Sequence, residues 1–215
     1  EIRASDWSSD VCSSDLQFAH KIVFVGNSAV GKTSIINRYI YGSTNAEHQP
    51  TVGIDFFTKT LKTQEGSVRL QIWDTAGQEK FHSLIPSYIK SSTFAVFVFD
   101  ITSKNSFDEL ENWYKMVTEL ANPMMMFVGN KVDLEEQREV STEEGKKFAE
   151  AHGGEYIETS SITPININEL FDLIAKQGPK NDASPVTLGN STEQEQPKTV
   201  EIKTEKPQSS GGCGC

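Results

Sequence analysis

The residues with the clearest chemical signal read GNSAVGKT and occupy positions 26–33. They match the pattern G-x-x-x-x-G-K-S/T, in which glycines let the backbone curl so that successive N–H groups converge on phosphate oxygens. Lys32 adds a compact positive charge for the terminal phosphates, and the Thr33 hydroxyl is a ligand that suits Mg²⁺. The motif predicts a nucleoside triphosphate site without specifying the base. The residues expected to line it are Asn27, Ser28, Ala29, Val30, Gly31, Lys32, Thr33 and Ser34.

The segment WDTAGQE contains residue types suited to metal binding and to the positioning of water. Asp74, at the end of an apolar run, is expected to hold Mg²⁺ through water, and the backbone N–H of Gly77 to contact the γ-phosphate. Gln78 is neutral, so we expect this residue to orient an attacking water rather than to remove its proton. Thr51 is expected to join Thr33 and Asp74 in the metal shell when the γ-phosphate is present.

The segment NKVD at 130–133 follows another apolar run and suits the reading of a base. The Asp133 carboxylate can accept two hydrogen bonds from guanine, whereas adenine has no such pair of donors. An unpaired buried carboxylate costs on the order of 1–3 kcal/mol or more, which favours GTP over ATP. Asn130 is expected to tie this loop to the phosphate loop and to face N7 of the base. The stem of Lys131 is expected to pack over the ring.

These loops need elements of secondary structure that bring them together. Buried strands are predicted at 21–26, 56–61, 68–73, 95–100, 124–130 and 156–157. Helices are predicted at 33–40, 107–120, 142–152 and 168–176, and the segment STEE at 141–144 resembles a capping box before the third of them. Because strands and helices alternate, the sequence predicts an α/β fold with a largely parallel sheet covered on both faces.

The composition excludes several functional classes. The chain has 215 residues, 36% of them hydrophobic and 23% charged, which suits a globular domain. Its formal charge of −10 argues against a protein that binds nucleic acid non-specifically. No run approaches the roughly 18 apolar residues needed to cross a bilayer. The three cysteines, Cys12, Cys213 and Cys215, leave the middle of the chain without any disulfide, as expected in a reducing cytosol.

The chain divides into three segments by composition. Residues 1–16 are rich in Ser and Asp and resemble translated adapter sequence, so we expect a non-native extension there. Residues 17–177 contain all of the predicted strands and helices and form the expected globular domain. Residues 178–215 are rich in polar residues and almost lack large apolar ones, which predicts a flexible tail.

The motifs together resemble the Ras superfamily over about residues 21–176. The stretches VGIDF, RLQIWDTAGQE, KFHSLIPSYIK and VFVFDIT are similar to those of Rab GTPases, and LIPSYI resembles the Golgi-associated Rab-six branch. The resemblance implies a P-loop fold of the Ras-like type, with a six-stranded mostly parallel sheet flanked by five helices. It also implies a monomeric switch that cycles between GTP and GDP with Mg²⁺ and regulates vesicle traffic. The implied partners are a GTPase-activating protein, an exchange factor, effectors and a GDP-dissociation inhibitor.

The sequence departs from this family around the predicted base site. ETSSI stands at 158–162 where the family usually has E-T-S-A-K. Ser160, Ser161 and Ile162 are expected to line the base site, and the Ser161 backbone N–H can still meet guanine O6, but Ile162 replaces the usual lysine. Thr44 stands where a phenylalanine usually packs on the base, and His48 replaces a common aromatic residue. These changes predict weaker guanine affinity than is usual in the family.

The sequence GGCGC closes the chain. It resembles the C-x-C ending on which Rab proteins carry two geranylgeranyl groups, which would place lipids on Cys213 and Cys215. Two lipid chains anchor a protein stably, whereas one anchors it marginally. The tail has no excess of basic residues, so anchoring would depend on the lipids. The resemblance implies a location on the cytoplasmic face of intracellular membranes, at the Golgi, with cycling to the cytosol.

The expected chemistry is in-line attack of a water oriented by Gln78 on the γ-phosphate. We find no candidate arginine finger in the chain, so turnover without a partner is expected to be slow. A GTP-loaded trafficking scaffold with negligible hydrolysis is the alternative, which the altered base site permits and Gln78 disfavours. An adenine-nucleotide kinase or ATPase would use the same phosphate loop but is disfavoured by Asp133.

Overall fold

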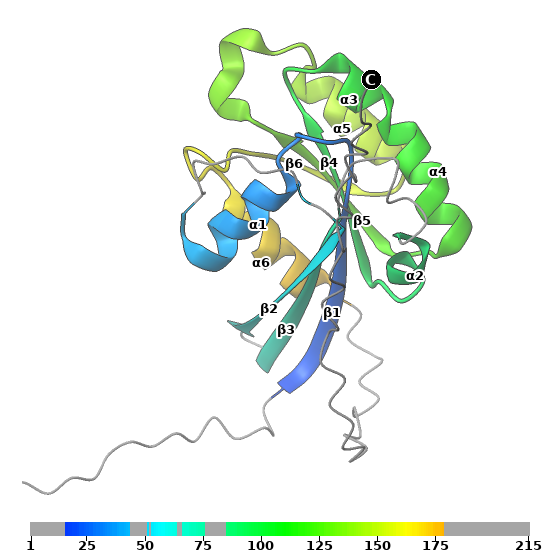
Figure 1. Cartoon of the computed structure of the whole chain (residues 1–215), viewed down its shortest axis with the longest axis vertical. Helices are drawn as coiled ribbons and strands as arrows, with labels where there is room; N and C mark the ends of the chain where they lie inside the picture. The colour runs from blue at the N-terminus through cyan, green and yellow to red at the C-terminus, as the bar shows by residue number, and fades with distance from the viewer. Residues whose placement is uncertain (1–15, 44–50, 52, 64–65, 76–84, 179–215) are drawn as a thin grey trace, which may run out of the picture. The chain divides into compact units, whose positions relative to one another are not determined.

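The computed structural model describes residues 16–43, 51, 53–63, 66–75 and 85–178, and its centre is a six-stranded sheet (Figure 1). The strand order is β2-β3-β1-β4-β5-β6. The strands are β1 Leu16–Val25, β2 Ile54–Thr63, β3 Gly66–Thr75, β4 Phe94–Asp100, β5 Met124–Asn130 and β6 Glu155–Thr159. Neighbouring strands are parallel, except that β2 and β3 form an antiparallel pair. The predicted α/β class and mostly parallel sheet are confirmed.

The central strands are apolar because helices cover both of their faces. All seven residues of β4 are buried. Along β1, Ile22 and Phe24 belong to the core on one face of the sheet, whereas Val23 and Val25 belong to the core on the other. This alternation explains why such strands show as continuous apolar runs in the sequence.

Strand β1 begins earlier than the apolar run at 21–26 predicted. Its pairing with β3 starts at Leu16, opposite Ser67, and continues through His20 opposite Leu70. Backbone hydrogen bonds to a long partner strand extend β1 through residues with no clear apolar pattern. The strand therefore begins at the last residue of the segment predicted to be a non-native extension.

Six α-helices lie among the described residues, one more than the resemblance implied. They are α1 Lys32–Tyr41, α2 Ile85–Ile89, α3 Lys104–Asp108, α4 Leu110–Leu120, α5 Thr142–Ala151 and α6 Ile167–Gln177, and a 3₁₀ helix spans Val132–Gln137. The single helix predicted at 107–120 corresponds to α3 and α4, which meet at Glu109. The short helix α2 was not predicted. The predicted capping box is confirmed, because Ser141 and Glu144 bond each other's backbone N–H groups at the start of α5.

Two hydrophobic cores fill the space between the sheet and its helices. On one face lie α1 and α6, and on the other lie α2, α3, α4 and α5 (Figure 1). The rings of Tyr39 and Phe171 stack with centroids 3.7 Å apart and join α1 to α6. Large side chains such as Phe24 and Phe171 are fully buried, and each contributes about 1.5–3 kcal/mol of transfer free energy. Among the described residues, no helix combines the length and apolar character needed to cross a membrane.

The parallel strands end at the same edge of the sheet, and this edge carries polar side chains. Buried polar residues stand at or near the carboxyl ends of four strands: Asp74 on β3, Asp100 on β4, Asn130 on β5 and Thr159 on β6. Ligands of open α/β sheets bind at this edge. The fold therefore brings together the three predicted loops, although they lie far apart along the chain.

Candidate functional site

The phosphate loop runs from the end of β1 to the start of α1 and is held against β5. Gly31 has φ 97°, and a Cβ atom at this position would lie 2.2 Å from Asn130 Nδ2. With glycine there, Asn130 Nδ2 donates a hydrogen bond of 2.8 Å to the Val30 carbonyl. Gly31 thus permits the contact by which the base-reading segment positions the phosphate loop.

Lys32 is buried within the phosphate loop. Its Nζ donates to the carbonyl oxygens of Gly26 at 2.8 Å and of Asn27 at 2.7 Å. Burial lowers the pKa of Lys32 to about 8, although the charge of Asp74 acts in the opposite direction. Lysine has three N–H donors and two are used here, so the ammonium group can still serve an anion. A phosphate would supply the charge partner that burial makes favourable.

The three residues predicted to bind metal lie together at the start of α1, although they come from separate segments. Thr33 Oγ1 donates to Asp74 Oδ2 at 2.6 Å and lies 2.6 Å from Thr51 Oγ1. Because Thr33 has one hydroxyl proton, Thr51 is the donor in the second contact. The sequence-predicted metal set of Thr33, Thr51 and Asp74 is therefore a contiguous group of oxygen atoms.

The Asp74 carboxylate has one oxygen atom available for a cation. Asp74 is fully buried, and its Oδ1 has no hydrogen-bond partner among the described residues. Burial raises the pKa of Asp74 to about 6, against the opposing effects of the Thr33 hydrogen bond and the Lys32 charge. A buried carboxylate oxygen without a partner is costly, and hard cations such as Mg²⁺ take oxygen ligands. These residues fit Mg²⁺.

The two segments predicted to read the base also meet in the structure. Ser160 Oγ donates to Asp133 Oδ1 at 2.5 Å and accepts from the backbone N–H of Ile162 at 3.2 Å. Thr159 Oγ1 donates to Asn130 Oδ1 at 3.1 Å. Both serines of the ETSS segment are buried, whereas the Ile162 side chain is 55% exposed. The loops after β5 and β6 are therefore bonded to each other.

Lys131 adopts the left-handed conformation with φ 70° and forms a contact that was not predicted. Its Nζ lies 2.6 Å from Asp100 Oδ2, at the end of β4. This ion pair orients Lys131 across the carboxyl edge of the sheet. The packing of its stem on a base stays a prediction.

Two further residues position the loops, and the sequence patterns did not reveal their roles. Trp113, which lies within the helix predicted at 107–120, donates from Nε1 to Asn27 Oδ1 at 2.8 Å and so links α4 to the phosphate loop. Arg38 on α1 donates from Nε to the Ser161 carbonyl at 2.6 Å and from Nη2 to the Ile162 carbonyl at 3.2 Å. No local sequence pattern identifies these contacts, because their partners lie far along the chain.

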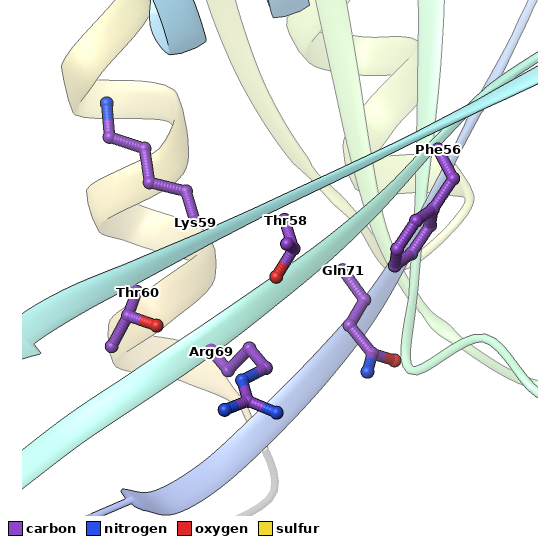
Figure 2. A pocket seen from close by; sticks show the side chains of 6 residues that line it. All are labelled: Phe56, Thr58, Lys59, Thr60, Arg69 and Gln71. Carbon is purple, nitrogen blue, oxygen red and sulfur yellow. The ribbon is translucent and has the colours of Figure 1, made fainter.

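Several predicted residues lie outside the described residues: Gly77, Gln78, Thr44, His48, Cys213 and Cys215. Their predicted roles stay predictions. A separate pocket of about 360 Å³ lies on β2 and β3, and it contains none of the predicted site residues (Figure 2). Its lining residues are Phe56, Thr58, Lys59, Thr60, Arg69 and Gln71.

The sequence profile of the Ras family matches residues 21–180. The match includes the phosphate loop, the metal-binding group and both base-reading segments. Members of this family are small GTPases that bind GTP and GDP with Mg²⁺ and generally hydrolyse GTP. The extent of the match, together with the geometry at the carboxyl edge of the sheet, shows that this chain belongs to the Ras family of small GTPases.

Proposed function

We propose that this chain is a Rab-type GTPase, which hydrolyses GTP slowly and regulates vesicle traffic through its GTP- and GDP-bound states. One observation carries the nucleotide part of this proposal. The Thr33, Thr51 and Asp74 oxygens form one group beside the buried ammonium of Lys32. Such a group suits a metal ion together with phosphates, which would supply the missing partners of the Asp74 oxygen and the Lys32 ammonium.

The described residues divide the work of binding. Thr33, Thr51 and Asp74 would hold Mg²⁺, which when bound neutralises charge on the β- and γ-phosphates. Lys32 and the backbone N–H groups of the phosphate loop stabilise the phosphate oxygens. Asp133 selects guanine, and its bond to Ser160 holds the carboxylate in place before the base arrives.

Hydrolysis would depend on Gln78, which orients the attacking water in line with the γ-phosphate. Because the sequence offers no candidate arginine finger, a partner's arginine would raise the rate by roughly 10³–10⁵. Departure of the γ-phosphate would remove the contacts of Thr51 and Gly77 with it. The loops that contain them would then change the surface offered to partners.

The cellular part of the proposal rests on the sequence. VGIDF and RLQIWDTAGQE support the Rab assignment, and LIPSYI supports a role at the Golgi. Geranylgeranyl groups on Cys213 and Cys215 would anchor the protein to the cytoplasmic face of these membranes. An exchange factor, effectors and a GDP-dissociation inhibitor would then direct its cycling with the cytosol.

A single set of measurements tests the proposal. Protein purified from its own cells is expected to contain GDP or GTP and two C-terminal prenyl groups by mass spectrometry. Loaded with GTP, it should turn over slowly in a single-turnover assay and faster in a cell extract, and Gln78→Ala should abolish the stimulated rate but not binding. Failure to take up guanine nucleotide in the presence of Mg²⁺ would refute the site. Binding without stimulated hydrolysis would favour the GTP-loaded scaffold.

A further inference from the structure

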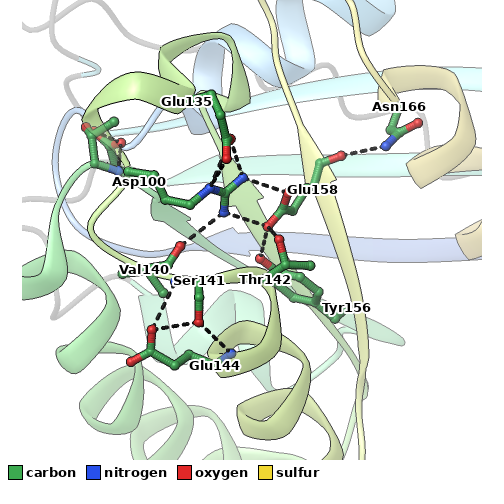
Figure 3. A network of polar contacts seen from close by, with 11 residues as sticks. Asp100, Glu135, Val140, Ser141, Thr142, Glu144, Tyr156, Glu158 and Asn166 are labelled. Carbon is green, nitrogen blue, oxygen red and sulfur yellow. Dashed lines mark hydrogen bonds and ion pairs between the residues drawn. The ribbon is translucent and has the colours of Figure 1, made fainter.

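A partly buried charge cluster lies beside the two base-reading segments in the sequence, and its side-chain hydrogen bonds involve none of the residues assigned above to the nucleotide. Its centre is Arg138, which follows the 3₁₀ helix that contains Asp133. Its partner is Glu158 on β6, two residues before Ser160. Figure 3 shows Glu135, Thr142 and Tyr156 gathered with Glu158 in this cluster. We propose that Arg138 is a positioning residue for guanine recognition, which sets the distance between the Asp133 loop and the Ser160 loop.

Arg138 uses all five of its N–H donors within the cluster. Towards Glu158, Nη1 donates to Oε1 at 2.9 Å and Nη2 to Oε2 at 3.0 Å, a bidentate pair. Towards Glu135, Nε donates to Oε1 at 2.8 Å and Nη2 to Oε2 at 2.7 Å. The remaining Nη1 hydrogen is donated to the Val140 carbonyl at 3.0 Å. A planar fork with every donor satisfied has one preferred position, so it transmits position as well as charge.

The Glu158 carboxylate is equally constrained. It accepts hydrogen bonds from the Tyr156 hydroxyl at 2.8 Å and the Thr142 hydroxyl at 2.9 Å, in addition to those from Arg138. Burial alone would raise the pKa of Glu158, but the hydrogen bonds from Arg138, Tyr156 and Thr142 outweigh it and hold the pKa below its ordinary value. The side chains of Arg138 and Glu158 are only 15% and 19% exposed. Solvent therefore screens this pair much less than a surface ion pair.

Packing under the cluster leaves Tyr156 little room to move. A Cβ atom at Gly145 on α5 would lie 2.4 Å from the Tyr156 ring. The absence of a side chain at this position lets the ring enter and brings its hydroxyl to Glu158. On the other side, Asn166 Nδ2 donates to the Glu158 carbonyl at 2.8 Å (Figure 3). Both the side chain and the backbone of Glu158 are thus held from neighbouring elements.

The cluster connects to the base site through short stretches of backbone. Arg138 lies five residues after Asp133, and Glu158 lies two residues before Ser160. Above the cluster, Ser160 Oγ bonds Asp133 Oδ1 directly. Two contacts consequently join the two loops. The first is the hydrogen bond from Ser160 to Asp133, and the second is the ion pair between Arg138 and Glu158. Without the fork, the Asp133 carboxylate would lose the fixed position from which it accepts two hydrogen bonds from guanine.

This inference rests on the proposed nucleotide site and is tested with GDP and with IDP, which lacks the 2-amino group. In the wild-type protein, GDP should bind more tightly than IDP because Asp133 accepts a hydrogen bond from that amino group. In Arg138→Met, we expect GDP release to accelerate about tenfold or more, and the ratio of the two affinities to fall towards one. In Arg138→Lys, which keeps the charge but not the fork, both effects should be smaller.

Two further variants separate positioning from stability. Arg138→Met/Glu158→Gln leaves no unpaired buried charge, so its thermal midpoint should recover while the GDP-to-IDP ratio stays low, because the tie is still absent. This double variant also carries the test if the single variant does not fold. Lys146→Met removes an exposed cation from α5 and serves as the matched control, with a wild-type ratio expected.

The possible results are distinct. A wild-type ratio in both the single and the double variant, with only the thermal midpoint lowered, would overturn the positioning role and leave a structural ion pair. Wild-type protein that binds neither GDP nor IDP would instead refute the proposed nucleotide site. A low ratio in the double variant beside a wild-type ratio in Lys146→Met would establish the inference.

Discussion

Asp74 and Glu158 are carboxylates near the carboxyl edge of one sheet, the first fully buried and the second only 19% exposed, yet their surroundings differ. Asp74 Oδ1 has no hydrogen-bond partner among the described residues, and burial raises the pKa of this residue to about 6. Glu158 is largely shielded from solvent, but its carboxylate accepts hydrogen bonds from Arg138, Tyr156 and Thr142, and its pKa lies below the ordinary value. One oxygen of Asp74 therefore lacks a hydrogen-bond donor among the described residues, whereas both oxygens of Glu158 accept hydrogen bonds from Arg138.

The same contrast extends to the regions around these residues. On the phosphate side, burial also lowers the pKa of Lys32, to about 8, so both charges there are disfavoured in the protein alone. On the base side, Arg138 has its donors satisfied and its pKa is raised. A bound cation would therefore stabilise the charged form of Asp74, and a bound phosphate the charged form of Lys32. On the base side the hydrogen bonds are already formed without nucleotide, and such preorganisation favours selection of a neutral base by geometry.

The largest expected effect comes from removing the ion pair between Arg138 and Glu158 on the base side. Arg138→Met should lower the free energy of unfolding by about 3–5 kcal/mol, because it leaves the Glu158 charge buried without its partner. Urea denaturation of the GDP-bound and the nucleotide-free protein measures this change. Adding Glu158→Gln should restore most of the loss. A change below about 1 kcal/mol would show that water already screens the pair.

On the phosphate side, Lys32→Met should weaken the binding of GDP rather than the stability of the fold. We expect GDP affinity to fall by about 10²–10³-fold, since charge-assisted hydrogen bonds to phosphate are worth about 1.5–3 kcal/mol each. The free energy of unfolding without nucleotide should change by less than about 1 kcal/mol, because relief of a buried charge offsets two lost hydrogen bonds. Competition against a fluorescent GDP analogue and urea denaturation give the two values. If the free energy of GDP binding and the free energy of unfolding fell by equal amounts, the proposed difference between the phosphate side and the base side would be wrong.

Asp74→Asn sharpens the same contrast with a single atom change. The variant should bind Mg²⁺ about 10–100-fold less tightly in its nucleotide complex, because an amide oxygen replaces a charged ligand. The nucleotide-free protein should become more stable, since the substitution removes a buried charge whose Oδ1 atom accepts no hydrogen bond from the described residues. Nucleotide release measured against Mg²⁺ concentration, with a melting curve for the free protein, tests both statements. Asp108→Asn, an exposed substitution on α3, should change neither quantity.

The pH dependence of stability should have opposite signs in the two regions. The raised pKa of Asp74 contributes stability that is present below about pH 4 and is lost as pH rises through about 6. The lowered pKa of Glu158 contributes stability that is present above its ordinary value of 4.5 and is lost as pH falls further. In the nucleotide-free protein, the advantage of Asp74→Asn over wild type should therefore grow from pH 4 to 6. The deficit of Glu158→Gln should shrink below pH 4.5. Melting temperatures between pH 3.5 and 8 test both trends.

The smallest expected effect concerns the link between α4 and the phosphate loop. Trp113→Phe keeps most of the ring but removes the donor to Asn27, which should cost about 1 kcal/mol of stability and accelerate GDP release a few-fold. Stopped-flow release of a fluorescent GDP measures the rate. Asn27→Ala should have a similar effect, and the two together should not add. Full additivity would show that the hydrogen bond plays no part.

Most of the architecture could be predicted from local patterns. The runs KIVFVG, AVFVFD and MMMFVGN are buried on both faces of the sheet, and this double burial is what made them continuous and visible. The capping box at Ser141 and Glu144 was equally local. The start of β1 at Leu16 and the short helix α2 were not predicted, because pairing and packing partners define them rather than their own sequence.

For the site, the sequence by itself determined which chemistry is present. The spacing of GNSAVGKT and NKVD sets backbone shape and donor type within a few neighbouring residues, so no distant contact is needed to identify them. Only the tertiary structure decided which charges have partners. Asp74 and Glu158 are identical in kind to any carboxylate in the sequence, and segments far along the chain supply Thr33 to one and Arg138 to the other. Pairing depends on position in space to within a few ångströms, which a list of residues does not contain.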